Sequence, residues 1–353
     1  MVRAQIVGAT GYGGVGMVEL LLRHPEIEIA SLLAKADTGR PLSAFYPHLR
    51  GFCDLVVEEA DADRIGEDAD VVIFSTPDGV GMSHAARLVE RGKKVLDYSG
   101  DFRFATPDLY AGYSRAHPNL KGAPHAAPEL FDAAVYGIPE LNRERIRNAR
   151  VVGNPGCFAV AMILALAPAI ASKMIDPTTI VVDGKTGVSG AGKKPSPTNH
   201  YPERNEAVMP YRVAAHQHHY ETVAALEALG GEKLGLTFVP HLVPTTRGII
   251  CTCYATLRDD LEPHAVQQAY EQIYADEPFV RVMPPSVAPG PKAVQGSNYC
   301  DVSVFVDGEN RRLIAVGSID NLMKGQAGVA LQNINLMCGF PETAGLERAP
   351  FYP

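Results

Sequence analysis

The chain has 353 residues, a length that predicts two domains. Hydrophobic residues make up 46% of it and charged residues 20%, as is ordinary for a globular protein with a sizeable core. The formal net charge of −8, from 32 basic and 40 acidic residues, argues against a general nucleic-acid or membrane-surface binder.

Strand and helix signals alternate over the first 155 residues. Strands are predicted at 2–7, 27–33, 68–77 and 93–99, and helices at 15–23 and 79–91. The third strand is an almost continuous apolar run, which is typical of a strand covered on both faces. This alternation predicts an α/β domain over residues 1–155, with a doubly wound parallel sheet of the Rossmann type.

The pattern changes after residue 155. The apolar stretch 157–171 contains Pro168 and is shorter than the roughly 20 residues that a membrane span needs, so we predict a buried helix. Longer alternating strands follow at 178–187, 233–243, 248–257, 300–308 and 311–319, interrupted by a helix at 263–274. We predict an α+β catalytic and dimerisation domain at 156–324 with a largely antiparallel sheet, and a C-terminal segment at 325–353 with a helix at 325–337.

One long segment, residues 187–205, is rich in Gly, Pro, Ser and Asn. It is too long for a simple connector, and we expect it to be either functional or disordered.

A glycine-rich turn, GATGYGG, follows the first predicted strand. Its spacing, G-x-x-G-x-x-G, is more often associated with NADP than with NAD, although a glycine-rich connector without a ligand is the alternative. Residues without a Cβ let backbone amides approach a diphosphate at a helix N-terminus. The predicted cofactor contacts in this turn are Gly8, Thr10, Gly11, Tyr12 and Gly13.

The end of the second predicted strand favours NADP(H) as the cofactor. A carboxylate that would hold the ribose of NAD is missing there, whereas Lys35 is present and Arg40 follows. Asp37 lies slightly beyond this point and weighs against the preference.

Six cysteines are scattered over the chain. This usage favours a reducing cytoplasm over a secreted disulfide framework, and the N-terminus lacks the features of a signal peptide. Cys251 and Cys253 form a C-x-C pair within an alternating strand, which predicts core cysteines on one face and not a zinc site. We predict no metal.

Cys157 stands directly behind Asn-Pro-Gly at the start of the apolar stretch. A helix N-terminus stabilises a thiolate, so Cys157 is a candidate nucleophile, with a buried structural cysteine as the alternative. Three histidines, His216, His218 and His219, precede a predicted helix. They allow a metal site, a solvated turn or a general acid/base, and spacing does not say which histidine lies near the thiol.

With these motifs in place, the chain resembles N-acetyl-γ-glutamyl-phosphate reductases, which belong to the aspartate-semialdehyde-dehydrogenase-like enzymes. The matching stretches cover nearly the whole chain and include GATGYGG, YPHLRG, DYSGDFR, YGIPELNR, GNPGC, GKTGVSGAGK, PHLVPTTRGI, GSNYCDV and IDNLMKGQAG. The resemblance implies NADPH-dependent reduction of an acyl phosphate through a cysteine thioester, in arginine biosynthesis. It also implies that the last helix returns to the Rossmann domain.

Site residues are carried over by position. Cys157 matches the catalytic cysteine, and His216 and His218 match the outer residues of a His-Arg-His segment, one of them the expected acid/base; the middle residue here is Gln217. The expected substrate contacts are Arg103, Asn154, Glu140, Lys185 and Arg247. Further expected cofactor contacts are Ser75, Pro77, Ser189, Gly190, Asn321 and Lys324.

Two alternatives stay open. One is a paralogue that reduces a carrier-protein-linked 2-aminoadipate or glutamate phosphate, since residues 196–206 resemble a loop of both groups. The other is a non-catalytic NADP-binding sensor. Among partners we expect a small acyl phosphate and further copies of the chain, as a homodimer or homotetramer, but neither nucleic acid nor membrane.

Overall fold

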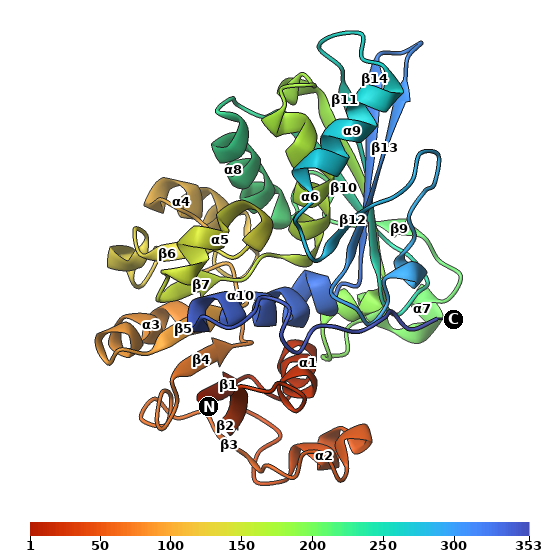
Figure 1. Ribbon diagram of the computed structural model, residues 1–353. Helices are drawn as coiled ribbons and strands as arrows, with labels where there is room; N and C mark the ends of the chain where they lie inside the picture. Colours follow the sequence, from red (N-terminus) through yellow and green to blue (C-terminus); the bar gives the residue numbers. More distant parts are fainter. Residues whose placement is uncertain (353) are drawn as a thin grey trace. The chain divides into compact units, whose positions relative to one another are not determined.

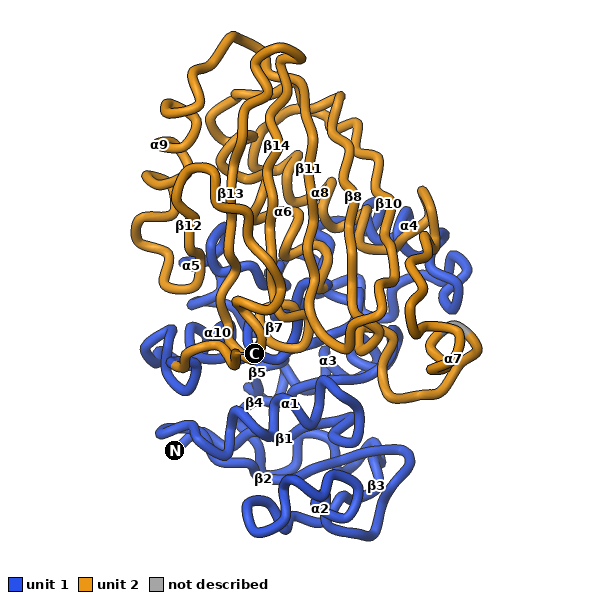
Figure 2. Tube along the Cα trace, turned by 90° about the vertical axis from the view of Figure 1, so that its right-hand side faces the viewer, with its two compact units in different colours: residues 1–156, 326–347 blue, residues 157–325, 348–353 orange. Residues whose placement is uncertain are grey.

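The computed structural model describes residues 1–352, apart from the side chain of Thr198. The chain forms two compact units, which Figure 2 distinguishes by colour. The first comprises Met1–Gly156 and Gln326–Glu347. The second comprises Cys157–Gly325 and the residues from 348 onward, so the chain enters the second unit at Cys157 and leaves it after Gly325.

The first unit is built on a seven-stranded sheet in the order β3-β2-β1-β4-β5-β7-β6 (Figure 1). All of its strand pairs are parallel, which confirms the predicted doubly wound sheet. Its strands are β1 (Val2–Val7), β2 (Ile27–Ala34), β3 (Val57–Glu59), β4 (Val71–Phe74), β5 (Lys94–Asp97), β6 (Ala134–Tyr136) and β7 (Val151–Gly153). Its helices are α1 (Tyr12–Leu21), α2 (Leu42–Phe45), α3 (Val80–Glu90), α4 (Pro107–Ala116), α5 (Pro139–Arg147) and α10 (Gly328–Cys338).

The strand order reverses between β1 and β4. Ligands of doubly wound sheets bind outside the carboxyl ends of the strands at such a switch point. The glycine turn follows β1 and Ser75 follows β4, so both lie at this position.

Helix α10 comes from the far end of the sequence but belongs to the first unit. It packs against α1 and α5 (Figure 1), and its residues Gly328 to Met337 are all buried. The helix begins later than predicted because the preceding residues, Met323–Ala327, form a wider π-helical turn.

The second unit has a seven-stranded mixed sheet in the order β12-β13-β14-β11-β8-β10-β9. Four of its six strand pairs are antiparallel, as predicted; β8–β10 and β12–β13 are parallel. Its strands are β8 (Ile180–Thr186), β9 (Met209–Pro210), β10 (Leu236–Leu242), β11 (Ile249–Thr256), β12 (Val280–Val282), β13 (Cys300–Asp307) and β14 (Arg312–Ile319). Its helices are α6 (Cys157–Ala171), α7 (Tyr201–Arg204), α8 (His218–Gly230) and α9 (Pro263–Ile273).

Helix α6 is the centre of the second unit. It packs against β11, β13 and β14 and against α8 and α9, and it is buried from Phe158 to Ile170. Two sheet glycines let it approach closely. A Cβ on Gly317 would lie 2.4 Å from the carbonyl oxygen of Ala161, and a Cβ on Gly184 would lie 2.7 Å from the ring of Phe158. These two contacts, at Phe158 and Ala161, fix the first turns of α6, which begins with Cys157, against the sheet.

Among residues 1–352, no helix packs on the other face of this sheet. In Figure 2 its strands lie in front of α6 and α8. Burial alternates along β11. Cys251 and Cys253 are fully buried, as predicted, and the residues that alternate with them along the strand are partly exposed. On β8 the open face carries Val181, whose exposure is 43%.

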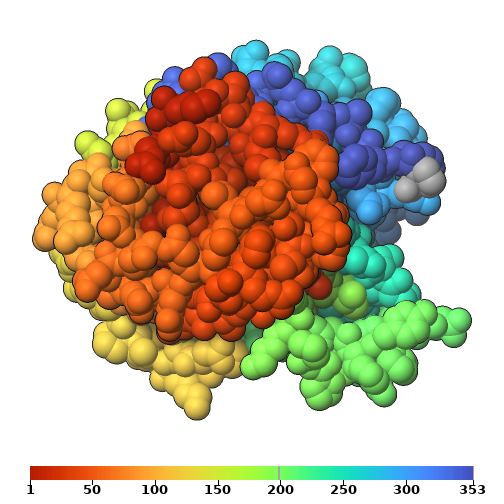
Figure 3. All heavy atoms as spheres, turned by 90° about the horizontal axis from the view of Figure 1, so that it is seen from below, coloured from red at the N-terminus to blue at the C-terminus, as the bar shows by residue number. Residues whose placement is uncertain are grey.

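The segment predicted as a loop at 187–205 contains short helical turns at Val188–Ala191, Pro197–Asn199 and Tyr201–Arg204. Figure 3 shows residues around 200 as a green projection. Large apolar side chains here and just beyond are well exposed, among them Tyr201 at 74% and Val208 at 66%.

Candidate active site

Cys157 is the first residue of α6, a helix of 15 residues, and its side chain is partly exposed. Gly325 lies directly against it, because a Cβ on Gly325 would come within 2.7 Å of the Cys157 Cβ. The π-helical turn therefore passes beside the thiol-bearing residue, and only a glycine fits at this contact.

The two predicted histidines gather around Phe158, the residue after the cysteine. The Phe158 ring lies edge-on to His216 with centroids 5.6 Å apart and to His218 with centroids 6.3 Å apart. The histidine rings are themselves 4.7 Å apart. The second unit therefore brings the two histidines together beside Phe158, the residue that follows Cys157 in α6.

His216 is the more enclosed of the pair, with 5% of its surface exposed. Its Nδ1 accepts a hydrogen bond from the backbone N–H of His218 at 3.2 Å, so the neutral ring carries its proton on Nε2. Burial, followed by the nearby charge of Arg212, lowers the pKa of His216 to about 3. His216 is thus a neutral imidazole at physiological pH.

His218 has a carboxylate for a neighbour. Its Nε2 lies 4.0 Å from Oε1 of Glu221, one turn further along α8, and the Glu221 side chain is 1% exposed. His218 therefore differs from His216 in having a buried carboxylate 4.0 Å from its ring.

Sequence reasoning missed two residues beside this cluster. The Tyr211 ring lies 5.6 Å from that of His216, and burial, then the nearby Cys157 charge, raises the pKa of its hydroxyl. The guanidinium of Arg212 donates to Oε1 of Gln217, so a cation lies beside the residue for which the resemblance implies arginine. A Tyr-Arg pair five residues before a histidine has no spacing signature.

In the first unit, the glycine turn between β1 and α1 has the geometry of an anion cradle. Gly8 has φ +88°, and a Cβ there would lie 2.2 Å from the Ser75 carbonyl oxygen. Helix α1 has no side-chain cap at Gly11 and no acidic residue in its first turn. A Cβ on Gly11 would meet only the Gly8 oxygen, at 3.6 Å. The N–H groups at the start of α1 have no side-chain cap, and the space beside Gly11 is open. Such N–H groups can bind a diphosphate, so the residues present fit a dinucleotide.

The other predicted cofactor residues of this unit lie at the same edge of its sheet. Lys35 is exposed directly after β2, and Arg40 beyond it stacks over the Phe45 ring at 5.1 Å. Ser75 and Pro77 follow β4. Both strands end beside the glycine turn, where an adenosine phosphate would be held.

The remaining predicted cofactor residues belong to the second unit. Asn321 joins two loops, since its Nδ2 donates to Ser189 at 2.9 Å and its Oδ1 accepts from the Gly248 N–H at 2.7 Å. Gly190 follows in the same short turn as Ser189. Lys324 is fully buried, with Nζ 5.6 Å from the centre of the Phe279 ring.

Two predicted substrate cations of the second unit are held by carboxylates. Arg247 pairs with the buried Asp320 at 3.0 Å. Lys185 pairs with Asp183 at 2.7 Å on the open face of the sheet, because Gly184 between them faces α6. The structure therefore does not bring Lys185 to the α6 face that carries Cys157.

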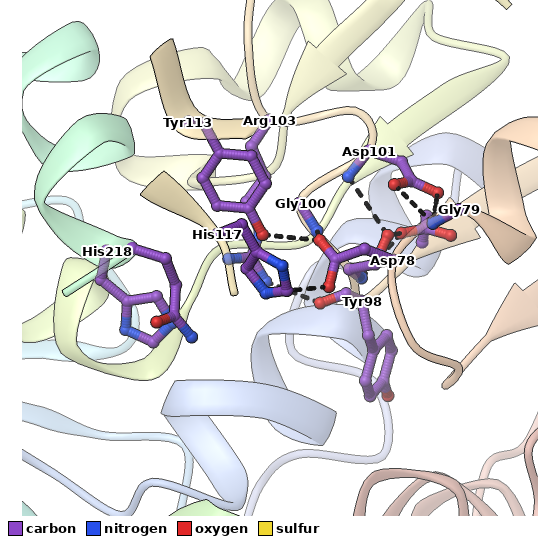
Figure 4. A network of polar contacts seen from close by, with 12 residues as sticks. Asp78, Gly79, Tyr98, Gly100, Asp101, Arg103, Tyr113, His117 and His218 are labelled. Atoms are coloured by element: carbon purple, nitrogen blue, oxygen red, sulfur yellow. Dashed lines mark hydrogen bonds and ion pairs between the residues drawn. The ribbon is translucent and has the colours of Figure 1, made fainter. Parts of the chain in front are cut away.

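In the first unit, the loops after β4 and β5 are tied by reciprocal hydrogen bonds (Figure 4). Asp101 accepts from the N–H groups of Gly79 and Met82, which caps α3 from outside the helix. In return Asp78 accepts from the N–H of Gly100 and the hydroxyl of Tyr113. This exchange holds the loop 98–103 in one conformation.

Two carboxyls of this loop are deeply buried. Burial, opposed by the N–H groups of Gly79 and Met82, raises the pKa of Asp101 to about 6. Burial and the adjacent Asp101 raise the pKa of Asp97 well above its usual range. Of the two carboxyls, Asp97 is therefore the one that keeps its proton to higher pH, which limits repulsion inside the loop.

The remaining predicted substrate residues also lie in the first unit. Arg103 donates from Nε to the Asn154 carbonyl at 2.8 Å and from Nη2 to the Tyr98 carbonyl at 2.6 Å. Asn154 is fully buried in the turn that follows β7. Glu140, at the start of α5, accepts from Gln332 of α10 at 3.5 Å.

Residues 1–352 contain no group of three or more His, Cys, Asp or Glu side chains arranged to hold a metal ion. Within the same residues, none of the helices is both long and apolar enough to cross a bilayer.

Comparison with known proteins identifies the family. Residues 3–149 match the family model described as "Semialdehyde dehydrogenase, NAD binding domain", and residues 157–321 match "Semialdehyde dehydrogenase, dimerisation domain". Proteins named N-acetyl-gamma-glutamyl-phosphate reductase from Syntrophobacter fumaroxidans and Desulforudis audaxviator are each 44% identical to this chain, over 100% of both sequences. The chain belongs to the N-acetyl-gamma-glutamyl-phosphate reductase family. The resemblance drawn from its motifs is confirmed.

Solved structures outside the N-acetyl-gamma-glutamyl-phosphate reductase family share the fold. Aspartate semialdehyde dehydrogenase II from Vibrio cholerae, complexed with ASA, matches with a TM-score of 0.71 at 18% identity over 96% of this chain and 98% of that one. Aspartate semialdehyde dehydrogenase with NADP from Candida albicans matches with a TM-score of 0.70 at 17% identity, with the same coverage.

The buried neutral His216 makes stability depend on pH. An unfolded histidine titrates at 6.5 and the folded one at about 3, so the unfolded chain binds more protons between these values. The stabilisation is complete above pH 6.5 and is lost as pH falls. The loss of unfolding free energy reaches about 2 kcal/mol at pH 5. His216→Asn keeps an acceptor for the His218 N–H. Its free energy of unfolding, measured with urea, should fall less between pH 7.5 and 5 than that of the wild type. Parallel pH curves for both proteins would contradict a neutral His216.

Proposed function

We propose that this protein reduces N-acetyl-γ-glutamyl phosphate to N-acetylglutamate semialdehyde and phosphate, with NADPH as reductant, in arginine biosynthesis. The observation that carries the proposal is Cys157 at the start of α6 with His216 and His218 around the adjoining Phe158. Membership of a family whose named relatives are N-acetyl-gamma-glutamyl-phosphate reductases supports the substrate.

Cys157 is the proposed nucleophile. Its position places the sulfur at the N-terminus of α6, where the N–H groups of the first turn and the helix dipole stabilise a thiolate. The Sγ attacks the acyl carbon, a C–S bond forms, the C–O bond to phosphate breaks, and phosphate leaves with the electron pair. The same N–H groups can stabilise the oxyanion of this step by several kcal/mol. The thioester splits one difficult reduction into two easier steps.

In the first unit, the residues that would hold NADP(H) are the glycine turn with Lys35, Ser75 and Pro77. The cofactor contacts Ser189, Gly190, Asn321 and Lys324 of the second unit stay predictions. When bound, NADPH supplies the hydride that reduces the thioester carbonyl. The C–S bond of the reduced adduct then breaks, and Cys157 Sγ leaves as the thiolate with the aldehyde released.

We assign to His218 the protons that are exchanged at the Cys157 thiol and at the oxygen of the reduced adduct. Glu221 lies 4.0 Å from its Nε2 and can stabilise the protonated ring, whereas the pKa of about 3 keeps His216 neutral. His216 instead fixes the start of α8 through the bond from the His218 N–H. The predicted substrate contacts Arg103, Asn154, Glu140 and Arg247 stay predictions that a substrate complex would test. Lys185 is not kept among them, because it lies on the sheet face away from Cys157.

The reverse reaction tests the substrate and the nucleophile together. With N-acetylglutamate semialdehyde, phosphate and NADP⁺, the wild type should form NADPH, and NAD⁺ should be the poorer cofactor. Cys157→Ser should lower the rate by at least about 10³-fold, because a serine hydroxyl is a far weaker nucleophile at neutral pH. It should still bind NADPH, as measured by nicotinamide fluorescence.

Two outcomes would contradict the proposal. A rate only with a carrier-linked aldehyde would replace the substrate by that of the paralogous reductases. Full turnover after complete alkylation of Cys157 would exclude the thioester, and NADPH binding without any turnover would favour the sensor.

Replacing the acid/base should be costly. We expect His218→Gln to lower kcat by about 10²-fold or more and to remove one limb of its pH profile. His219→Gln is the matched control, since this neighbour contacts Tyr220 and has no ring contact with Phe158 among the described residues. If His218→Gln and the control had the same pH profile, the assignment to His218 would be wrong.

We propose that the open face of the second sheet joins two copies of the chain. The alternation along β8 leaves Val181 exposed on this face, beside the charged pair of Asp183 and Lys185. The match of residues 157–321 to a dimerisation domain supports this location. We expect a homodimer, or a homotetramer built from it, and the cysteine usage still predicts the cytoplasm.

A charge on this face should dissociate the assembly. We expect Val181→Glu to halve the mass measured by light scattering after gel filtration. Leu229→Glu, at an exposed position of α8, should leave the mass unchanged. Equal masses for both variants would place the contact elsewhere.

A further inference from the structure

The turn between β7 and α6 is held by an unusually complete set of hydrogen bonds. Asn154 is fully buried, and four of its polar groups have partners within the first unit. Its N–H donates to the Asp97 carbonyl at 2.7 Å, and its carbonyl accepts from Arg103 at 2.8 Å. Its side-chain Nδ2 donates to the Gln326 carbonyl at 3.1 Å, and its Oδ1 accepts from Asn333 at 3.3 Å.

Asn333 reaches this turn from α10, 179 positions away along the chain. Its Nδ2 donates to the Gly137 carbonyl at 2.8 Å as well as to Asn154. Because a carbonyl can only accept, the amide must present Nδ2 to it, which fixes the orientation of the Asn333 side chain. A Cβ on Gly137 would lie 2.5 Å from that nitrogen, so the approach requires glycine.

Arg103 closes the turn from the other side. Its two donors bridge the carbonyls of Tyr98 and Asn154, and 8% of the residue is exposed. The loop that carries it is itself fixed by the exchange between Asp78 and Asp101. The guanidinium therefore joins the ends of β5 and β7.

We propose that Asn333 and Arg103 are positioning residues for the Cys157 thiol. Pro155 and Gly156 alone separate Asn154 from Cys157, so the backbone of this turn continues directly into the first residue of α6. Displacements of about 1 Å at a reacting atom can cost about 10²-fold in rate. The proposal rests on the proposed function and gives Arg103 a role other than binding substrate.

The chain offers a matched control two residues away. Asn335 is also a fully buried asparagine of α10, but its Nδ2 donates to the carbonyls of Glu342 and Ala344, and its Oδ1 faces His24. Asn333→Ala and Asn335→Ala should therefore lose similar stability while only the first loosens the turn before Cys157.

The experiment measures Cys157 directly. The rate of its alkylation by iodoacetamide is followed from pH 6 to 9.5 by site-resolved mass spectrometry, together with the melting temperature, kcat and KM. For Asn333→Ala we expect about fivefold slower alkylation at pH 7, a kcat lower by about tenfold, and KM within about twofold of the wild type. Asn335→Ala should keep the wild-type alkylation profile and kcat. Identical profiles for the two variants at equal loss of stability would overturn the proposal.

Arg103→Lys provides a second test that does not depend on Asn333→Ala being folded. A lysine keeps the charge but lacks the planar fork that bridges two carbonyls. A positioning role predicts slower alkylation and lower kcat at unchanged KM. A higher KM with wild-type alkylation would instead make Arg103 a substrate contact and overturn its part of the proposal.

Failure of the proposed function would be seen separately. If the wild type does not act on the acyl phosphate or the aldehyde, the substrate is wrong. The alkylation profiles of Asn333→Ala, Asn335→Ala and Arg103→Lys still report whether the turn positions the thiol.

Discussion

The N–H groups in the first turn of α6 are the feature on which the chemistry of this protein depends. In the proposed mechanism they stabilise negative charge, first on the sulfur of Cys157 and then on the oxygen of the acyl group that it attacks. Their direction is set by how α6 is seated. Gly184 and Gly317 let the helix lie against the sheet, and Gly325 lets the π-helical turn pass beside Cys157. Close packing at these three glycines thus determines where the first turn of α6 lies against its sheet.

Charge near the cluster is controlled by burial and pairing. His216 is kept neutral by an apolar enclosure, while His218 has a carboxylate within reach. Arg247 is paired with a buried carboxylate, which makes it part of the framework of the second unit. A fixed environment of this kind needs little reorganisation during a reaction, and this is how preorganised sites lower barriers.

The sequence allowed the parallel sheet, the start of α6, the glycine turn and the residues of the histidine cluster to be predicted, because each has a local signal. A strand followed by glycines, or a cysteine before an apolar run, is visible within ten residues. It did not reveal β3 and β6, which have three residues each and no clear period. Nor did it reveal Asn333, whose partner Asn154 lies 179 positions away. What Arg103 and Lys185 contact depends on which face of a strand or loop each side chain occupies. The local sequence does not specify that face.

The first unit is formed by two separate segments of the chain, and this affects how the protein is synthesised and folded. A ribosome delivers residues 1–156 early, but α10, which packs against α1 and α5, is delivered only after the entire second unit. Until then the Gly137 carbonyl lacks the donor that Asn333 provides, and the faces of α1 and α5 that receive α10 stay bare. The amino-terminal sheet therefore cannot mature ahead of the rest of the chain, and completion of both units is coupled to the end of synthesis.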